Sequence, residues 1–216
     1  KTFPEQKLNQ NSKYSWVGNP VRSEFANLPE KNSIDFPLNL LVVGGSLGAQ
    51  VLNEVVPLSL TNMNQINVCH QTGAGHLAKV QEAYSHQAIE QGLYQITEFI
   101  DDIPAAYAWA DLVICRAGAL TVAEISAAGV PAIFVPLPHA VDDHQTKNAQ
   151  TLVKLQAAEL LPQSELTPQK LCTLLEKYVK SPSTLIEMGK RAKTVACLEA
   201  AKEVAYYCIK LSEREE

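Results

Sequence analysis

The hydrophobic positions of this chain fall into short runs that are separated by longer segments with a helical period. Five runs are four to six residues long, and they contain almost no polar alternation. Runs of this kind are typical of strands that are covered on both faces of a sheet. The predicted strands are residues 38–43, 66–70, 93–97, 112–115 and 132–135.

The segments between these runs carry apolar residues at helical spacing. Short strands that alternate with helices predict an α/β fold, in which a parallel sheet has helices on both faces and right-handed crossovers. Beyond Gln163 the pattern is helical only. The predicted helices are residues 49–60, 75–86, 103–109, 119–128, one that starts near Asp142, and then 167–180, 183–195 and 199–211.

Composition and charge narrow the class of protein. The 216 residues are 46% hydrophobic, which is enough for a sizeable core. Their net charge of −5 makes nucleic acid an unexpected partner, because affinity for nucleic acid depends mainly on basic side chains. The longest apolar stretch, residues 130–138, contains three prolines and is far shorter than the roughly 20 residues of a membrane span.

Five cysteines are widely spaced and form no C-x-x-C pair. A disulfide framework or a structural zinc site would need closer spacing, so we expect buried, reduced thiols. The sequence also lacks a G-x-S-x-G elbow, an H-E-x-x-H motif and a D-x-D motif. No catalytic group is therefore assigned, and no metal or cofactor is expected.

In an open parallel sheet, ligands bind beyond the carboxyl ends of the strands. The first loop at that edge is Gly44-Gly45-Ser46-Leu47-Gly48-Ala49. Its glycines let the backbone approach an anion, the next helix offers free N–H groups, and Ser46 adds a hydroxyl. A tight turn that needs glycine explains the same pattern.

The second loop runs from Arg116 into a helix that starts near Ala119. Glu124 lies in the first turns of that helix, where its carboxylate could accept hydrogen bonds from a ribose diol. Thr121 and Glu124 also fit a capping box, in which the glutamate bonds a backbone N–H. Both interpretations stand at this point.

The third loop, residues 136–145, contains His139, Asp142, Asp143, His144 and Gln145. The two histidines invite a metal interpretation, but they straddle the junction of loop and helix. Either aspartate suits a helix N-cap. Gln145 could bind a sugar hydroxyl.

Two smaller features complete the candidates. Asp102 precedes Ile103-Pro104, which predicts an N-cap with proline in the first turn. The backbone of Ile100, just past a strand, could pair with a planar heterocycle. Arg22, after the Asn19-Pro20 turn, is either a solvated charge or a phosphate ligand.

Five segments together resemble the MurG family of bacterial glycosyltransferases. They occur in the family's order and spacing, and the similarity runs from about Val17 to the last residue. The segments are VGNPVR (17–22), LVVGGSLGA (41–49), TEFIDD (97–102), RAGALTVAE (116–124) and DHQTKNA (143–149).

The resemblance implies one half of a two-domain glycosyltransferase-B fold, with a helical C-terminal tail. Residues 1–16 would be a linker or strand from an N-terminal half, residues 17–163 the UDP-sugar-binding domain, and residues 164–216 helices that complete it. The N-terminal half would carry the acceptor site, the membrane-facing surface and the catalytic base.

The resemblance also implies an activity. The family transfers N-acetylglucosamine from UDP-N-acetylglucosamine to the C4 hydroxyl of lipid I, with inversion, and so produces lipid II for peptidoglycan. It works as a peripheral protein on the cytoplasmic side of the inner membrane. We expect the present chain to bind the donor without turnover. The alternatives are another glycosyltransferase-B enzyme, a UDP-N-acetylglucosamine epimerase, or a non-catalytic nucleotide-binding module.

Carried over by position, the resemblance gives each candidate residue a role. Uracil would pair with the backbone of Ile100, the ribose hydroxyls with Glu124, and the N-acetylglucosamine hydroxyls with Gln145, while His144 receives no role. The expected ligands of the diphosphate are Arg22, Ser46 and the helix start formed by Ala119, Leu120, Thr121, Val122 and Ala123.

Overall fold

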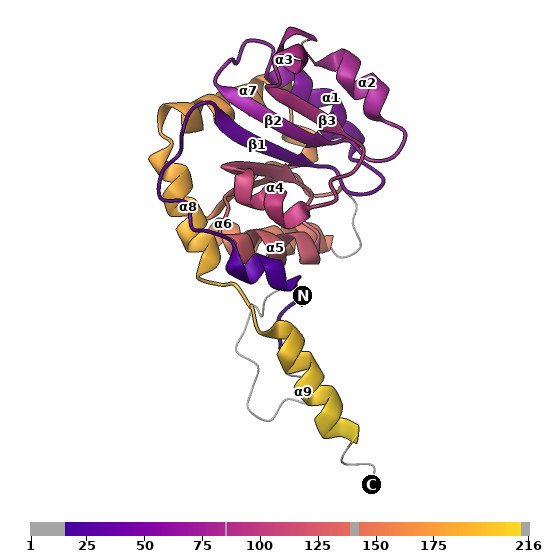
Figure 1. Cartoon of the computed structure of the whole chain (residues 1–216), viewed down its shortest axis with the longest axis vertical. Helices are drawn as coiled ribbons and strands as arrows, with labels where there is room; N and C mark the ends of the chain where they lie inside the picture. The colour runs from indigo at the N-terminus through magenta and orange to yellow at the C-terminus, as the bar shows by residue number, and fades with distance from the viewer. Residues whose placement is uncertain (1–15, 85, 139–142, 213–216) are drawn as a thin grey trace.

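The computed structural model describes residues 16–84, 86–138 and 143–212. Within them the chain forms a six-stranded parallel sheet with the strand order β3-β2-β1-β4-β5-β6 (Figure 1). This is the order of a Rossmann fold, so the predicted fold class is confirmed. The strands are β1 (Leu38–Val43), β2 (Ile66–Gln71), β3 (Tyr94–Thr97), β4 (Leu112–Cys115), β5 (Ala132–Phe134) and β6 (Ala158–Leu160).

The sixth strand is absent from the sequence prediction. Strand β6 has only three residues, and its central residue, Glu159, interrupts the apolar pattern. The Glu159 carboxylate accepts hydrogen bonds from Tyr178 and Lys177, at 2.7 and 3.0 Å. Pairing with β5 and these two contacts define the strand, and neither can be found in the local sequence.

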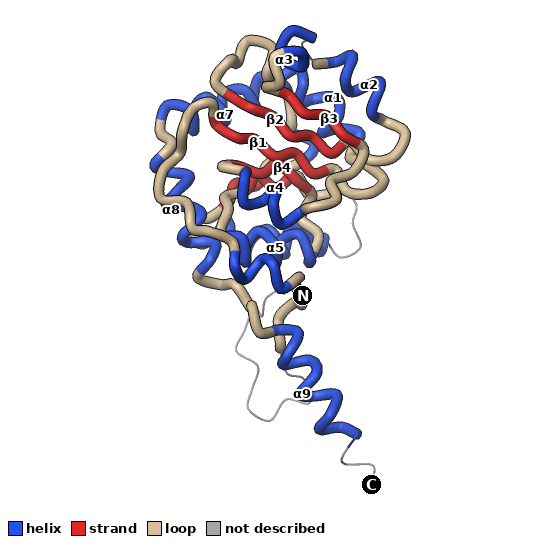
Figure 2. Tube along the Cα trace, viewed as in Figure 1, coloured by secondary structure: helices blue, strands red, loops and turns tan. Residues whose placement is uncertain are grey.

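Helices cover both faces of the sheet and enclose two apolar cores (Figure 2). One face is covered by α1 (Gln50–Ser59), α2 (Leu77–Ala83), α3 (His86–Glu90), α7 (Pro168–Lys180) and the start of α8 (Ser183–Lys193). The other face is covered by η1 (Ser23–Asn27), α4 (Ile103–Trp109), α5 (Ala119–Ala128) and α6 (His144–Lys154). A short turn, η3 (Gln163–Glu165), precedes α7.

The single helix predicted over residues 75–86 is wrong. Helix α2 starts at Leu77 and ends at Ala83, and α3 begins at His86. Tyr84 breaks the helix because its backbone is extended and its side chain turns inward, where it is 3% exposed. The Tyr84 hydroxyl lies 2.8 Å from His70 Nδ1 on β2. A tertiary contact has overridden the local helical pattern.

The last helix, α9 (Ala200–Ser212), projects away from the sheet (Figure 1). Its apolar side chains remain exposed; Ile209 and Leu211 are 60% and 62% accessible. Among the described helices, none is both long and apolar enough to cross a bilayer. The division into residues 1–16, 17–163 and 164–216 stays a prediction, and residues 1–15 lie outside the described part of the chain.

All five cysteines are free thiols, as the spacing predicted. Burial was predicted correctly for Cys69 and Cys115, which lie on strands. It was wrong for Cys208, which is exposed on α9. The apolar residues around Cys208 belong to a helix whose Ile209 and Leu211 side chains are exposed, so the hydrophobic pattern overstates its burial.

Candidate functional site

The glycine turn after β1, residues 44–49, is both a structural requirement and an open surface. Gly48 has a φ of +75°, and a Cβ there would lie 2.2 Å from the Thr72 carbonyl oxygen, so only glycine fits. Gly45 also has a positive φ, but nothing lies within 4 Å of its Cβ position. Ser46 beside it is exposed. The tight-turn interpretation is therefore confirmed at Gly48, whereas anion binding at Gly45 and Ser46 stays a prediction.

Helix α5 begins with backbone donors that have no partner within the helix. Gly118 is its N-cap, and the Val122 N–H makes the first helical bond to the Gly118 carbonyl, at 3.0 Å. The N–H groups of Ala119, Leu120 and Thr121 precede that bond and are left over by helix geometry. Three donors of this kind at the carboxyl edge of β4 form an anion-binding element.

The same geometry excludes the capping box. Thr121 is the third residue inside α5 and does not occupy the N-cap, so Thr121 and Glu124 cannot cap the helix in that way. The Val122 side chain is fully buried in the core, so only its backbone lies near the helix start. Ala119 and Leu120 are exposed, whereas Ala123 is half-buried.

Glu124 and Arg22 lie close enough to influence each other electrostatically. Burial raises the pKa of the Glu124 carboxyl, and the positive charge of Arg22 opposes that shift. Arg22 is exposed at the start of η1, which packs on α5. A half-buried carboxylate beside a cation is a good acceptor for hydroxyl groups.

Gln145 joins two of the three loops. Its side-chain oxygen accepts hydrogen bonds from the N–H groups of Ala117 and Leu137, at 3.3 and 2.9 Å. The side-chain oxygen is thereby committed to the protein, and the amide nitrogen is the group that remains for a ligand. Gln145 also lines a hollow of about 620 Å³ between the glycine turn and the start of α6.

Arg116 and Gln163 line the same hollow, and sequence reasoning gave neither a role. The Arg116 guanidinium donates to the carbonyl oxygens of Val135 and Pro136, at 3.0 and 3.1 Å, and to Gln163 Oε1 at 2.8 Å. Burial lowers its pKa, and no carboxylate pairs with it in the described residues. An arginine directly after a strand was the available signal.

Ile100 lies in a separate hollow further along the same edge. This hollow of about 420 Å³ is lined by Thr97, Phe99, Ile100 and Trp109, among others. Next to it, Asp102 caps α4 by accepting the Ala105 N–H at 3.0 Å, as predicted. Along the edge the candidates thus follow the strand order, from Ile100 after β3 to Gln145 after β5.

The third loop is only partly described. His139, which is one of the two histidines in the metal interpretation, and Asp142 lie outside the described residues. Helix α6 begins at His144, with Asp143 at its N-cap in the left-handed region, but the Asp143 side chain makes no cap bond. Residues 16–84, 86–138 and 143–212 contain no cluster of three metal-ligating side chains.

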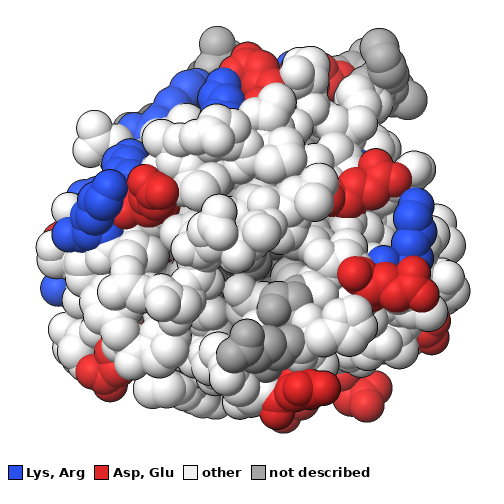
Figure 3. All heavy atoms as spheres, turned by 90° about the horizontal axis from the view of Figure 1, so that it is seen from above, with Lys and Arg blue, Asp and Glu red and all other residues white. Residues whose placement is uncertain are grey.

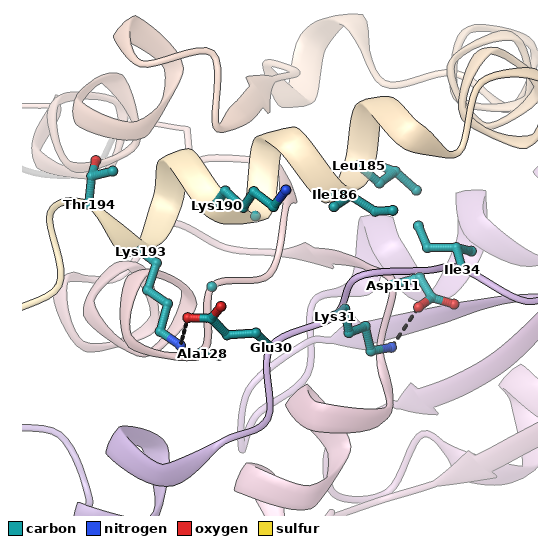
Figure 4. Close-up of a pocket in the computed structure, with 12 residues that line it drawn as sticks. Glu30, Lys31, Ile34, Asp111, Ala128, Leu185, Ile186, Lys190, Lys193 and Thr194 are labelled. Carbon is teal, nitrogen blue, oxygen red and sulfur yellow. Dashed lines mark hydrogen bonds and ion pairs between the residues drawn. The ribbon is translucent and has the colours of Figure 1, made fainter.

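A further hollow of about 340 Å³ lies at the opposite edge of the sheet (Figure 4). Leu185 and Ile186 on α8 and Ile34 form its apolar wall. Two ion pairs border it: Lys31 with the buried Asp111 at 2.5 Å, and Lys193 with Glu30 at 3.0 Å. Each of these charges has an opposite charge as its partner, which is typical of residues that stabilise the fold.

Basic and acidic side chains also lie side by side on the outer surface (Figure 3). Lysines of α7 pair with acids at short range, such as Lys177 with Glu159 at 3.0 Å and Lys180 with Glu176 at 3.4 Å. In Figure 3 itself, blue and red side chains alternate over the face, which shows mixed charge.

Comparison with known proteins gives these features a family. The model of the glycosyltransferase family 28 C-terminal domain matches residues 39–204. A Pseudoalteromonas atlantica protein named UDP-N-acetylglucosamine--N-acetylmuramyl-(pentapeptide) pyrophosphoryl-undecaprenol N-acetylglucosamine transferase is 54% identical over 211 residues. The match covers 97% of this chain and 55% of that protein, so the chain spans about half the length of such relatives.

Solved structures agree. The crystal structure of Acinetobacter baumannii MurG matches with a TM-score of 0.79 and 38% identity, over 97% of this chain and 59% of that one. A UDP-GlcNAc 2-epimerase from Neisseria meningitidis matches with a TM-score of 0.54 and 11% identity, over 82% of this chain and 45% of that one. The second likeness shows the fold alone. This chain belongs to glycosyltransferase family 28, in which it is a MurG homologue that corresponds to the C-terminal domain.

Proposed function

We propose that this chain is the donor-binding domain of a glycosyltransferase that makes lipid II. It binds UDP-N-acetylglucosamine at the carboxyl edge of its sheet, and the whole protein transfers the sugar to lipid I. The observation that carries this proposal is the α5 start, where three backbone donors follow β4, the strand that pairs with β1 and its glycine turn, and where Arg22 acts electrostatically on Glu124. The relatives' names give the chemistry of the ligand.

Each part of the ligand has a matching group. The α5 donors, Ser46 and Arg22 bind the diphosphate, and Glu124 accepts hydrogen bonds from the ribose hydroxyls. The Ile100 backbone pairs with uracil in its own hollow. Gln145 offers its amide nitrogen to the sugar, because its oxygen already bonds Ala117 and Leu137.

The reaction is an in-line displacement at the anomeric carbon, in which the acceptor oxygen attacks and UDP leaves. Negative charge then grows on the leaving diphosphate. Backbone N–H groups that are already aimed at that position stabilise the charge without reorganisation. Acceptor binding, the base and peripheral contact with the membrane belong to the rest of the whole protein, so this chain alone binds donor without turnover.

Isothermal titration of the chain with UDP-N-acetylglucosamine, UDP and NAD tests the proposal. We expect binding of both uridine ligands and none of NAD. Tight NAD binding, or no uridine-nucleotide binding at millimolar ligand, would contradict the assignment.

Gln145 gives a sharper test of sugar recognition. Gln145→Glu keeps an oxygen acceptor for Ala117 and Leu137 but removes the amide donor. We expect the ratio of UDP-N-acetylglucosamine affinity to UDP affinity to fall about five- to tenfold, the equivalent of one hydrogen bond; repulsion between the new carboxylate and the diphosphate acts on both ligands and leaves this ratio unchanged. Gln145→Ala, which also releases both loops, is the comparison variant. Equal losses for both ligands in Gln145→Glu would exclude a sugar-binding role.

A further inference from the structure

Four buried residues form a hydrogen-bonded chain behind the glycine turn. Tyr84 Oη lies 2.8 Å from His70 Nδ1, and His70 Nε2 lies 3.1 Å from Asn53 Oδ1. Asn53 Nδ2 donates to the Thr72 carbonyl at 3.0 Å. Each of the four side chains is at least nine-tenths buried. The chain links α2, β2 and α1, which lie side by side at this end of the sheet (Figure 1).

Along these four residues every hydrogen bond has one donor and one acceptor, and the Thr72 carbonyl decides which is which. The Thr72 carbonyl can only accept, so the Asn53 atom that faces it is the NH₂ group, and Asn53 Oδ1 faces His70. His70 must then donate from Nε2 and accept the Tyr84 hydroxyl at Nδ1. Burial lowers the pKa of His70 to about 3, so the imidazole is neutral and holds a single tautomer.

Thr72, the last of the four hydrogen-bonded residues, lies against the glycine turn. The Thr72 carbonyl oxygen, which accepts from Asn53, is the atom that lies 2.2 Å from the Cβ position of Gly48. Gly73 packs on the same residue, since a Cβ on Gly73 would lie 2.2 Å from the Gly48 nitrogen. The Ala74 N–H also donates to the Ser46 carbonyl at 3.2 Å. The backbone of residues 72–74, whose Gly73 N–H also donates to the Glu98 carbonyl at 3.2 Å, thus contacts the glycine turn at both Gly48 and Ser46.

We infer that His70 is a positioning residue for the diphosphate: through Asn53 it orients the Thr72 peptide, and that peptide holds the glycine turn and Ser46 in their binding geometry. The inference rests on the proposed function, because it assigns the turn to the second phosphate of UDP. His70 itself has no exposed surface and does not touch the ligand. The first phosphate, next to the ribose, lies at the α5 start, and its binding does not depend on the hydrogen bonds of His70 and Asn53.

The ratio of UDP affinity to UMP affinity isolates this role, since UMP lacks the second phosphate. Asn53→Leu keeps the branched shape and the number of side-chain heavy atoms and removes the link from His70 to Thr72. We expect the ratio to fall about five- to tenfold, with UMP affinity unchanged within twofold. Tyr84→Phe is the matched control: it removes a hydrogen bond from the outer end of the chain and leaves Asn53 bonded to Thr72. It lowers thermal stability and retains the ratio.

The outcomes separate the two proposals. If the unchanged chain binds neither nucleotide, the proposed function fails. If it binds both and Asn53→Leu retains the ratio, or Tyr84→Phe loses it equally, the positioning role fails and the proposed function stands. A second measurement needs no variant: ¹⁵N NMR of the His70 ring should show the proton on Nε2 from pH 5 to 8. A proton on Nδ1, or titration in that range, would overturn the inference.

Discussion

The two edges of the sheet both carry hollows that are lined by charged or polar side chains, but those side chains have different partners. At the amino edge, Lys31 bonds the Asp111 carboxylate at 2.5 Å and the Trp109 carbonyl at 2.6 Å, and Asp111 also accepts the Asn39 N–H at 2.8 Å. At the carboxyl edge, helix geometry leaves the first N–H groups of α5 without a helical partner, and no acid within the described ranges pairs with the Arg116 cation.

The contrast separates stability from binding within one fold. Groups that satisfy each other tie the segment before β1 to the start of β4 and stabilise the chain. Groups without such partners keep part of their hydrogen-bonding capacity for a ligand. The hollow at the amino edge is therefore structural, and because we propose that the carboxyl edge binds a ligand, substitutions at the two edges should give different results.

The largest effect is expected where the carboxyl edge is most tightly packed. Gly48→Ala forces an alanine into the left-handed region and drives its Cβ into the Thr72 carbonyl, at 2.2 Å. We expect the free energy of unfolding to fall by about 4 kcal/mol, from about 1–2 for the backbone and the rest for the displaced loop. Chemical denaturation measures this loss.

Gly45→Ala is the control, because it has a φ of +81° but no neighbour within 4 Å. It should lose only the backbone contribution, about 1–2 kcal/mol. Equal losses in the free energy of unfolding for the two variants would mean that the contact with Thr72 does not contribute to the cost of Gly48→Ala.

The amino edge gives the next largest effect. Asp111→Ala leaves Lys31 and the Asn39 N–H without their acceptor, and Asp111 is 4% exposed. We expect a loss of about 2–3 kcal/mol in the free energy of unfolding, below the usual range for a fully buried pair because Lys31 is part-exposed. The UDP affinity should not change.

Lys193→Met provides the comparison for Asp111→Ala. It removes the pair with Glu30, whose side chain is mostly exposed, and should alter stability by less than about 1 kcal/mol. A weaker UDP affinity in Asp111→Ala, at a temperature where the variant is folded, would break the distinction between the two edges.

Most of the fold could be predicted from sequence because its core strands are continuous apolar runs. Strand β4 and helices α4 and α5 have the predicted limits. The failures occur where a distant residue decides the local structure. Helix α2 ends at Tyr84, because the Tyr84 side chain bonds His70 in the core. Glu159 lies in β6, where Tyr178 and Lys177 bond its carboxylate.

The candidate site was located from sequence, but its internal contacts were not. Strand ends followed by glycine or by a helix start gave the edge at which binding is proposed. The bonds of the Gln145 oxygen to two loops, and the turn of Arg116 back to Val135, depend on contacts between residues 8 to 28 positions apart. The roles of the candidate residues toward a ligand stay predictions.

Binding at the carboxyl edge should respond to Glu124. Glu124→Ala removes the carboxylate that accepts from the ribose, and we expect UDP affinity to weaken by about 1–3 kcal/mol. Because Gly118 and not Thr121 caps α5, thermal stability should be retained. Unchanged affinity in titration calorimetry would remove Glu124 from the site.

The smallest effect is the most specific to a binding residue. The folded-state pKa of Glu124 is raised by burial, so the folded chain holds its proton more tightly than the unfolded chain. The charged form therefore costs stability above the folded pKa, and that cost is lost as the pH falls through the folded pKa towards 4.5. UDP binding should weaken over the same interval, because a protonated Glu124 is a poorer acceptor for the ribose.

Glu124→Gln removes the charge while it keeps the shape. At pH 7 we expect it to raise the free energy of unfolding slightly, by about 0.5 kcal/mol, and to weaken UDP binding. The stability difference between the two proteins should vanish as the pH approaches 4.5. Because both proteins share all other carboxyls, the contributions of those groups cancel in this difference. A variant that is less stable at pH 7 would show that Glu124 is a structural group like Asp111, and the contrast between the two edges would no longer hold at this residue.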